Sequence, residues 1–482
     1  MSILITLGAL LFLMLIAYRG YSVILFAPVA AMAAVLLTDP SAVPPVFTGL
    51  FMEKMVGFVR LYLPVFLLGA VFGKVIELSG FSRVIVASVI RVVGPQRTMA
   101  AIVCVCALLT YGGVSLFVVV FAVYPFAAEM FRLGDIPKRL IPGTIALGAF
   151  TFTMDSLPGT PQIQNIIPTT FFKTTTWAAP WLGVIGGIFI LVSGLAYLEW
   201  RRRAAAAAGE GYGSGHSNEP ETAIVAASSE AEAIADVSPA ESWIPKSILP
   251  WIALLPLLVV GVSNVVFTRL IPQYYSSPLE TSLPGMTAPL VTQVPTVTAI
   301  WAVEGALLLG ILTVLAFSFS TVRRKFPEGS KTAVAGALLA ALNTASEYGF
   351  GAVIATLPGF LVIRDGLKAI PDPLFNEAAT VTTLAGVTGS ASGGMSIALA
   401  SMADHFLASA NAAGIPPEVL HRVAAMASGG MDTLPHNGAV ITLLAVTGLT
   451  HRQAYKDIFA ITCIKTLAVG VVILVYYTTG IV

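Results

Sequence analysis

Charged residues are scarce in this sequence. Of its 482 residues only 11% are Asp, Glu, Lys or Arg, whereas 56% are hydrophobic and the mean hydropathy is +0.87. An average soluble domain is about 25% charged, and a chain this poor in charge cannot cover a water-soluble surface. The composition therefore excludes soluble enzymes, nucleic-acid-binding proteins and secreted disulfide scaffolds. It predicts an all-α polytopic membrane protein whose surroundings are a lipid bilayer.

Cysteine and histidine are also scarce, with three and five residues. Cys104, Cys106 and Cys463 lie in apolar runs, which is typical of small core residues and predicts neither a metal site nor a disulfide framework. The His-Glu-x-x-His motif of metalloproteases is absent. No basic stretch precedes the first apolar run and no small-residue cleavage pattern follows it, so we expect this run to remain as a membrane anchor. We expect no catalytic residues, metal or cofactor.

Seven apolar runs are long enough to cross a hydrocarbon core of roughly 30 Å. They cover residues 3–18, 22–37, 57–79, 177–200, 248–270, 299–320 and 458–479. Lys and Arg are absent from 271–298, whereas 201–246 and 321–331 contain basic clusters. The positive-inside rule places the two basic connections in the cytoplasm and 271–298 outside. Because 201–246 is rich in Ala, Glu, Ser and Gly, we expect this loop to be disordered.

Four short motifs recur in the same order in the two halves of the chain, with separations of 277 to 281 residues. They are Phe-Gly-x-Val-Ile at 72–76 and 350–354, Gly-Gly-x-Ser at 112–115 and 393–396, Ile-Pro at 136–137 and 415–416, and Met-Asp-(Ser or Thr)-Leu-Pro at 154–158 and 431–435. This regularity indicates a duplication. The loop charges predict that the first copy enters the membrane from outside and the second from the cytoplasm, which is the inverted-topology arrangement of secondary transporters.

The duplication divides the chain into five parts. We predict N-terminal scaffold spans over 1–56, a first repeat over 57–200, the loop over 201–246, linking spans over 247–332 and a second repeat over 333–482. In each repeat, Gly, Ser and Pro interrupt two apolar stretches. We predict re-entrant hairpins at about 99–131 and 378–410, with one long kinked helix as the alternative, and broken helices at about 138–172 and 423–449.

The hairpin tips and the helix breaks are the candidate substrate site. Glycine lets the backbone approach a ligand, and N–H groups at the start of a half-helix favour an anion. Hydroxyls and amides in apolar surroundings need a partner, which a substrate can supply. The candidates are Gly112, Gly113, Ser115, Ser392, Gly393, Gly394 and Ser396 at the tips, and Ser156, Gly159, Thr160, Thr433, His436 and Asn437 at the breaks.

Four ionisable residues inside apolar segments are candidates for proton coupling: Asp155, Glu347, Asp432 and His436. Each also has a structural alternative, since an aspartate can cap a helix start and a buried acid or histidine can be satisfied by its neighbours. Lys74 and Glu77 are expected to pair with each other. No arginine clamp for a substrate is evident. His421 is placed near a polar connection, and Glu129, Glu304, Asp404 and Lys465 lie too near the ends of spans for an assignment.

With its paired Met-Asp-Ser-Leu-Pro-Gly and Met-Asp-Thr-Leu-Pro-His-Asn-Gly elements and Gly-Gly-Val-Ser upstream, the sequence resembles the gluconate permease (GntP) family of the ion transporter superfamily. The resemblance covers about 1–200 and 247–482. It implies an inner-membrane proton symporter for small organic acids, with an elevator-type architecture of a dimerising scaffold and a mobile transport domain. Superfamily members that use sodium often carry Ser-Asn-Thr at the hairpin tips. The tips here read Tyr-Gly-Gly-Val-Ser and Ser-Ala-Ser-Gly-Gly, which favours protons.

The expected function is therefore proton-coupled uptake of a small carboxylate. Gluconate or a related sugar acid is the first substrate class, and a short-chain hydroxy acid such as 3-hydroxybutyrate, or D-serine, is the alternative. A channel is a further alternative. An intramembrane aspartyl protease would need its two carboxylates to face each other and share a proton. The Gly-x-Gly-Asp signature of such proteases is absent here.

Overall fold

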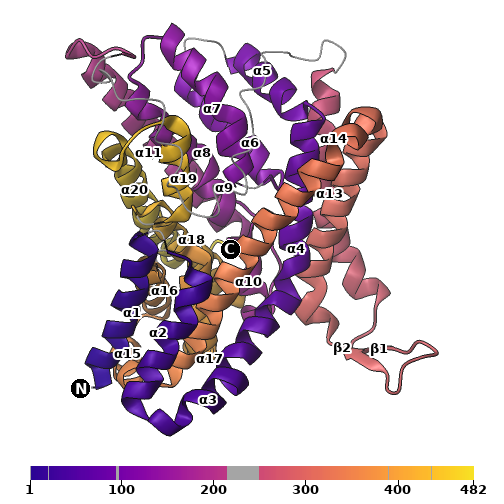
Figure 1. The fold of residues 1–482 in the computed structure, drawn as a ribbon, viewed down its shortest axis with the longest axis vertical. Coiled ribbons are helices and arrows are strands. Elements are labelled where there is room, and N and C mark those ends of the chain that lie inside the picture. Colours follow the sequence, from indigo (N-terminus) through magenta and orange to yellow (C-terminus); the bar gives the residue numbers. More distant parts are fainter. Residues whose placement is uncertain are drawn as a thin grey trace.

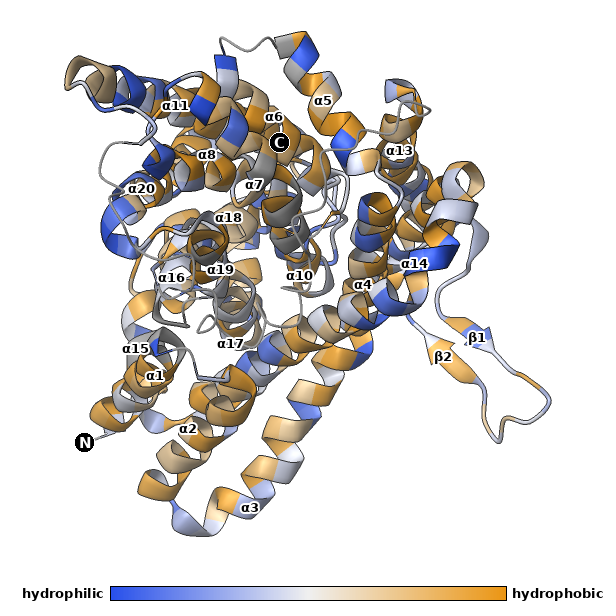
Figure 2. Cartoon of the chain, turned by 45° about the horizontal axis from the view of Figure 1, so that its top comes forward, coloured by the Kyte–Doolittle hydropathy of each residue, from blue (hydrophilic) through white to orange (hydrophobic). Residues whose placement is uncertain are grey.

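The computed structural model describes residues 2–19, 21–93, 97–114, 116–213, 249–388, 390–435 and 437–482. Over these residues the chain is helical almost throughout. Five helical segments are long and apolar enough to cross a membrane: Pro40–Leu78, Pro180–Ala207, Pro250–Tyr274, Val294–Thr356 and His451–Thr479. Hydrophobic residues cover most of the helices of the N-terminal and middle regions (Figure 2). The prediction of an all-α polytopic membrane protein is confirmed.

The N-terminal and middle elements lie outside the two repeats, apart from the end of the last helix, which belongs to the second repeat. They are α1 (Ser2–Tyr18), α2 (Val23–Thr38), η1 (Pro40–Ala42), α3 (Val43–Pro45), η2 (Val46–Phe51), α13 (Pro250–Tyr274), β1 (Leu279–Thr281), β2 (Leu290–Thr292) and α14 (Val294–Thr356). The two strands pair in antiparallel fashion in a small ribbon that projects at the lower right of Figure 1. Residues 271–298, the stretch without Lys or Arg, include this ribbon.

The first repeat contains a long helix, a hairpin, a broken helix and a final span. These are α4 (Met52–Leu78), α5 (Phe81–Val93), α6 (Thr98–Tyr111), α7 (Leu116–Leu133), η4 (Lys138–Leu140), α8 (Ile141–Ala149), α9 (Phe152–Asp155), α10 (Ile163–Phe172) and α11 (Pro180–Ala207). Helices α6 and α7 pack against each other, so this region is a hairpin and not one kinked helix. A seven-residue interval, 156–162, separates α9 from α10.

The second repeat has the same succession of elements. After the last part of α14 come α15 (Pro358–Lys368), α16 (Pro373–Thr388), α17 (Ala391–Ala412), α18 (Pro417–Gly429), η6 (Gly430–Thr433), α19 (Gly438–Thr447) and α20 (His451–Thr479). Helices α16 and α17 form the second hairpin. Helix α5 lies at the top of Figure 1 and its counterpart α15 at the bottom, and the two hairpins likewise occupy opposite halves. The two repeats are therefore inverted, as predicted.

Helices run through three of the boundaries at which the sequence analysis divides the chain. Helix α4 begins at Met52 rather than at 57. Residues 321–333 lie inside α14, which is continuous apart from a non-helical conformation at Ser318. Residues 201–207, placed in a disordered loop, are the last turns of α11. In the last case the run is Arg and Ala, both strong helix formers, so it extends the preceding span. Residues 214–246 of that loop lie outside the described residues.

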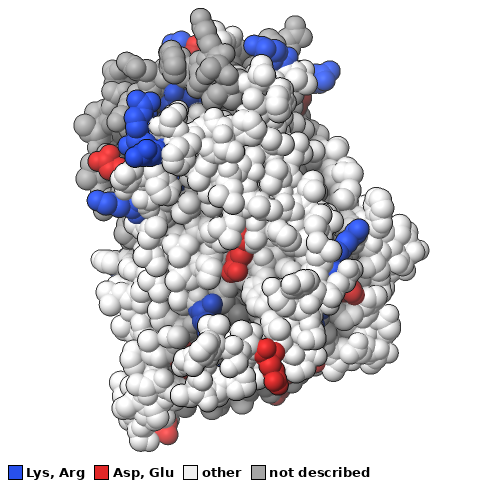
Figure 3. Space-filling view, turned by 90° about the vertical axis from the view of Figure 1, so that its right-hand side faces the viewer, with Lys and Arg blue, Asp and Glu red and all other residues white. Residues whose placement is uncertain are grey.

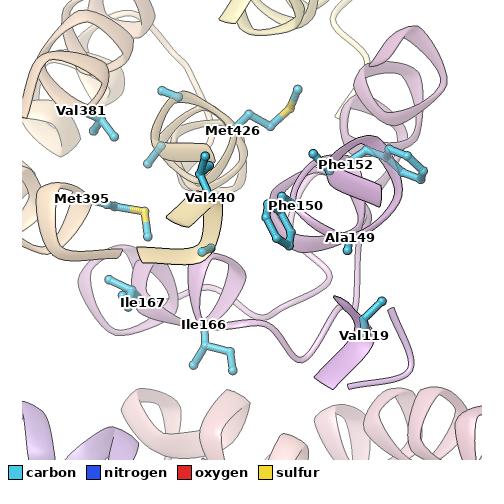
Figure 4. Close-up of a cluster of buried hydrophobic side chains, with 14 of the residues drawn as sticks. Val119, Ala149, Phe150, Phe152, Ile166, Ile167, Val381, Met395, Met426 and Val440 are labelled. Carbon is cyan, nitrogen blue, oxygen red and sulfur yellow. The ribbon is translucent and has the colours of Figure 1, made fainter. Parts of the chain in front are cut away.

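The broken helices are enclosed by apolar side chains from both repeats. Figure 4 shows Phe150 and Phe152 of the first repeat on one side of this cluster and Met426 and Val440 of the second on the other. Basic side chains gather instead at the upper end of the molecule, on the face drawn in Figure 3. The fold therefore places the two broken helices in a central position among apolar side chains, away from the charged end.

Candidate functional site

The first helix break, residues 156–162, is a tight turn between α9 and α10. Gly159 has a φ of +77°, and a Cβ at this position would collide with the indole ring of Trp177, so glycine is required. The Thr160 hydroxyl donates to a carbonyl oxygen of α9 over 2.7 Å. The side-chain amide of Asn165 donates to the Thr160 carbonyl oxygen over 3.0 Å. Protein hydrogen bonds thus hold the break in one conformation.

The tip of the first hairpin rests on this break. The Tyr111 hydroxyl donates to the Pro158 carbonyl oxygen over 2.8 Å. The side-chain amide of Gln162 donates to the Thr110 carbonyl oxygen over 2.7 Å. Gly113, with a φ of +95°, turns the chain between α6 and α7. The tip and the break of the first repeat, identified separately as candidates, are therefore in direct contact.

The tip of the second hairpin is built around the start of α17. Ser390 caps this helix, and its hydroxyl oxygen accepts a hydrogen bond from the Gly393 N–H over 3.1 Å. A Cβ on Gly393 would overlap the carboxylate of Glu347 from α14. The Ser392 and Thr344 hydroxyls lie 3.4 Å apart. Glu347 and the second tip, which are far apart in sequence, thus meet where α17 packs on α14.

The second helix break lies between η6 and α19. The Thr433 hydroxyl shares a hydrogen bond of 2.7 Å with the Thr462 hydroxyl of α20. The Oδ1 atom of Asn437 accepts a hydrogen bond from the Ala439 N–H over 2.8 Å, so Asn437 caps the start of α19. Both side chains are buried. Thr433 and Asn437 therefore have structural roles in the second break. A role of either side chain in substrate binding stays a prediction.

Lys465 of α20 is the centre of the buried polar groups. Its ammonium donates to the Phe150 carbonyl oxygen over 2.6 Å and also to that of Gly429, and it lies 3.4 Å from Oδ2 of Asp155. The Ser156 hydroxyl donates to the other carboxylate oxygen of Asp155 over 2.7 Å. Lys465 and Asp155 are each 1% exposed. A charge pair this deeply buried persists only when each charge is matched and hydrogen-bonded.

The second repeated aspartate has a different environment. Asp432 accepts a hydrogen bond from the Gln164 side-chain amide over 2.9 Å and one from the Ala391 N–H over 3.3 Å. Among the described residues no Lys, Arg or His nitrogen lies within ion-pair distance of its carboxylate, and no hydrogen bond joins it to Asp155. The two aspartates, although equivalent in sequence, therefore differ: one is ion-paired and the other is held by neutral donors.

Arg422 and His421 also belong to this buried network. The Arg422 guanidinium donates to the carbonyl oxygens of Asp155 (2.9 Å) and Ala178 (2.7 Å) and to Oδ1 of Asn165 (3.1 Å). The His421 ring nitrogen Nε2 lies 3.2 Å from the same Asn165 oxygen. His421 lies near a polar connection, as expected, since its Nδ1 is 2.7 Å from the Thr174 hydroxyl between α10 and α11, and an arginine does stand at the site. Arg422 binds main-chain oxygens of the protein, because α18 carries it from the start of the helix into the buried polar network around Lys465.

The position of Lys465 corrects the sequence analysis as well. Helix α20 begins at His451, seven residues before the predicted span, so Lys465 lies in the middle of the helix and not near its end. A lysine or arginine alone among apolar residues of a long helix is a costly placement. The energetic cost of such a placement was the sequence signal that could have pointed to functional roles for Lys465 and Arg422. Elsewhere the predicted pair of Lys74 and Glu77 is confirmed at 3.2 Å, whereas Cys463 is exposed on α20 and is not a core residue.

A cavity of about 460 Å³ opens between α4, α10, α14 and α17. Of the candidate residues, Ser396 lines it, and the buried Ser396 hydroxyl has no hydrogen-bond partner among the described residues. Arg60 and Tyr62 from α4 and Thr170 from α10 line the same space. Arg60 makes no ion pair within the described part of the chain. The cavity is large enough for a small organic molecule and contains a cation and hydroxyls that can orient one.

The structure thus brings most of the candidate residues into a few neighbouring groups. Ser115 and His436 lie outside the described residues. Gly394, where a Cβ would meet the main chain of α16, allows close packing of the second hairpin. The remaining candidates form the tip–break contact of the first repeat (Gly112, Gly113, Gly159, Thr160), the Lys465 cluster (Asp155, Ser156), the second tip with Glu347 (Ser392, Gly393), and the second break (Asp432, Thr433, Asn437).

No protein-family model matches the sequence. The chain is 56% identical over 483 residues to the Bacillus subtilis (strain 168) protein described as "Uncharacterized transporter YxjC", and the match covers 100% of both chains. The solved structure of the Alcanivorax borkumensis YdaH transporter aligns with 99% of this chain and 98% of its own, with 15% identity and a TM-score of 0.45.

The inverted repeats, the interrupted helices and the 56% identity to YxjC define a membrane transporter and not an enzyme. The intramembrane protease alternative is thereby set aside. The chain belongs to the same transporter family as YxjC of Bacillus subtilis.

Proposed function

We propose that this transporter is a secondary active symporter that takes up a small organic acid together with protons. Gluconate or a related sugar acid is the first candidate substrate, in keeping with the resemblance to the gluconate permease family. A short-chain hydroxy acid such as 3-hydroxybutyrate, or D-serine, is the alternative. The gradient of protons supplies the energy, and no cofactor takes part.

One observation carries this proposal: two interrupted helices and two hairpin tips from inverted repeats converge around buried carboxylates. Transporters of this general design bind substrate and coupling ion where half-helices end near mid-membrane. Here Asp155 and Asp432 lie in such breaks, and Glu347 lies against the second tip. Intramembrane carboxylates are expensive, and a proton-transfer role accounts for that expense.

The cavity beside the second hairpin supports an anionic substrate. Arg60 and Lys54 are the cations of its lining, Glu53 is its one carboxylate, and the hydroxyl residues Ser396, Tyr62 and Thr170 line the same space. An arginine is suited to bind a carboxylate through two parallel hydrogen bonds, and hydroxyls are suited to the hydroxyl groups of a sugar acid or hydroxy acid. The glycines and N–H groups of the two tips complete the proposed recognition of the acid.

Asp432 is our preferred proton carrier among the four candidates. The charge of Asp155 is matched by Lys465, so protonation there would leave the ammonium without its partner. The donors around Asp432 are neutral, and one of them, Gln164, can rotate its amide to meet either protonation state. Asp432 can therefore gain and lose a proton without leaving a buried cation uncompensated.

The elevator-type movement, homodimeric assembly and placement in the bacterial inner membrane are also part of the proposal. The long helices α4, α13 and α14 pack together (right-hand side of Figure 1) and would form the stationary scaffold. The hairpins and broken helices would move against them. The basic residues of α11 and α14 favour a cytoplasmic location for the upper end of the molecule.

Uptake into proteoliposomes tests the proposal directly. Labelled gluconate and labelled 3-hydroxybutyrate are supplied in parallel, each with and without an inward proton gradient, in sodium or in choline buffer. We expect one acid to accumulate only with the gradient, saturably and equally in both buffers. Failure to take up either acid by folded protein would contradict the substrate class, and non-saturable flux without accumulation would indicate a channel.

A further inference from the structure

The ammonium of Lys465 has the surroundings of a bound monovalent cation. Its neighbours are two main-chain carbonyl oxygens, those of Phe150 and Gly429, and one carboxylate oxygen of Asp155. Carbonyl and carboxylate oxygens are the ligands that hard metal cations prefer. All of these groups are buried, and Phe150 belongs to the apolar cluster of Figure 4.

The two carbonyl oxygens occupy equivalent places in the inverted repeats. Phe150 caps the C-terminal end of α8, and Gly429 is the last residue of α18, the helix that corresponds to α8. The two residues are 279 positions apart, within the range that separates the repeated motifs. The C-terminal end of a helix carries a partial negative charge, so two such ends converge on one point together with a carboxylate. A positive charge at that point is electrostatically required.

Close approach at this point depends on the absence of a side chain at Gly429. A Cβ there would overlap the carboxylate of Asp155. The main chain of α18 can therefore lie directly against Asp155, which brings the three oxygens close enough together to share one cation. The equivalent region of the first repeat's last helix, around Gly187 and Ile188, carries no cation, so a single ammonium from α20 serves both repeats.

We propose that this cluster is a monovalent-cation site of the transporter that Lys465 fills permanently with its own ammonium. The lysine then does the work that a bound sodium ion does where half-helices end in a sodium-driven carrier. The consequence for transport, independence from sodium, rests on the proposed function. The site itself does not, because its occupancy can be measured without any substrate.

Removing the lysine side chain should open the site to a free ion. We would purify wild-type protein and the K465A, K465M and K465A/D155N variants and measure thermal unfolding in NaCl and in choline chloride at equal ionic strength. We expect the Tm of K465A to be higher in sodium than in choline by about 3 °C or more, with saturation as sodium rises. Wild type and K465M, whose side chains fill the space, should show no such difference.

The double variant covers the case in which K465A is too unstable without a cation. K465A/D155N removes both charges of the pair, so it should fold in either salt and should not respond to sodium. Folding of K465A in sodium but not in choline would support the proposal. Equal Tm values of K465A in both salts, or failure of K465A in both while K465A/D155N folds, would overturn it. A sodium response of wild type, or failure of the double variant to fold, would overturn it as well.

Discussion

The side-chain amide of Gln164 donates to Oδ2 of Asp432 over 2.9 Å, and this hydrogen bond connects the first helix break to the second. Because Asp432 has neutral partners, Asp432→Asn should preserve the fold: the Gln164 oxygen, which lacks a partner among the described residues, can accept from the new amide. We expect a Tm within about 2 °C of wild type. Uptake should no longer respond to a proton gradient, while exchange of labelled for unlabelled acid should continue.

The matched control is Asp404→Asn, at an exposed position of α17 in the same repeat. This variant should keep both gradient-driven uptake and exchange. Proton-stimulated uptake by Asp432→Asn at the wild-type level would rule out Asp432 as the proton carrier and return attention to Glu347 and His436.

Gly393→Ala should impair transport through a steric effect. A Cβ at Gly393 would overlap the Glu347 carboxylate, so this carboxylate must leave its place against the second tip. We expect at least a severalfold loss of the maximal uptake rate, measured in proteoliposomes at saturating substrate. Gly470→Ala is the control, because a Cβ there meets nothing within 4 Å and alanine favours the helix. Equal rates for Gly393→Ala and Gly470→Ala would contradict a tight contact between the second tip and α14.

Asn437→Ala should abolish uptake without reducing the amount of protein in the membrane. The substitution removes the cap of α19, which costs about 1 kcal/mol, and it also removes an amide from the candidate substrate site. Asn437→Ser separates these effects, since serine also caps helices well. We expect Asn437→Ser to restore the Tm but not the uptake kinetics. Full recovery of uptake with serine would assign Asn437 to capping alone.

A cluster of charges at the upper end of the molecule should govern stability and not transport. Asp457 of α20 accepts hydrogen bonds from Arg139 (3.1 Å), Arg201 (2.6 Å) and Tyr197 (2.8 Å), and it is 1% exposed. Asp457→Asn leaves two arginines without this partner, so we expect a loss of about 3 kcal/mol of unfolding free energy. Its effect on Tm is compared with that of a control variant at an exposed ion pair.

That control is Glu129→Gln, which breaks the solvent-exposed pair with Arg132. It should change the unfolding free energy by no more than about 0.5 kcal/mol. If Asp457→Asn changed the unfolding free energy as little as this, the Asp457 carboxylate would not anchor α20.

Arg60→Gln should weaken substrate binding while leaving proton coupling intact. Loss of one charge-assisted hydrogen bond of about 1.4 kcal/mol corresponds to a roughly tenfold rise in KM. Arg60→Lys retains the charge without the planar fork and should have an intermediate KM. An unchanged KM in Arg60→Gln would show that the cavity beside α4 does not hold the acid.

Local sequence patterns predicted the fold well where they determine local structure. Gly113 and Gly159, with positive φ, sit at a tip and a break that glycine, serine and proline within apolar stretches predict. Lys465 and Arg422 were missed, because their roles depend on which main-chain oxygens other helices bring to them. Long helices also continued through expected boundaries, since a run such as 201–207 has no helix-breaking residue. The chemistry of the buried polar network depends on which residues of different helices meet in the fold, and sequence spacing does not encode those contacts.

Lys465 is a single lysine between two equivalent carbonyl oxygens, and this explains why the two repeats belong to one chain. A symmetric dimer of identical half-length chains would bring either two ammonium groups or none to the axis that relates α8 and α18. Two would repel each other beside the same carboxylates, and none would leave the converging helix ends without a counter-charge. Only halves of different sequence can place one positive charge there. Covalent fusion guarantees that every molecule receives one half of each kind.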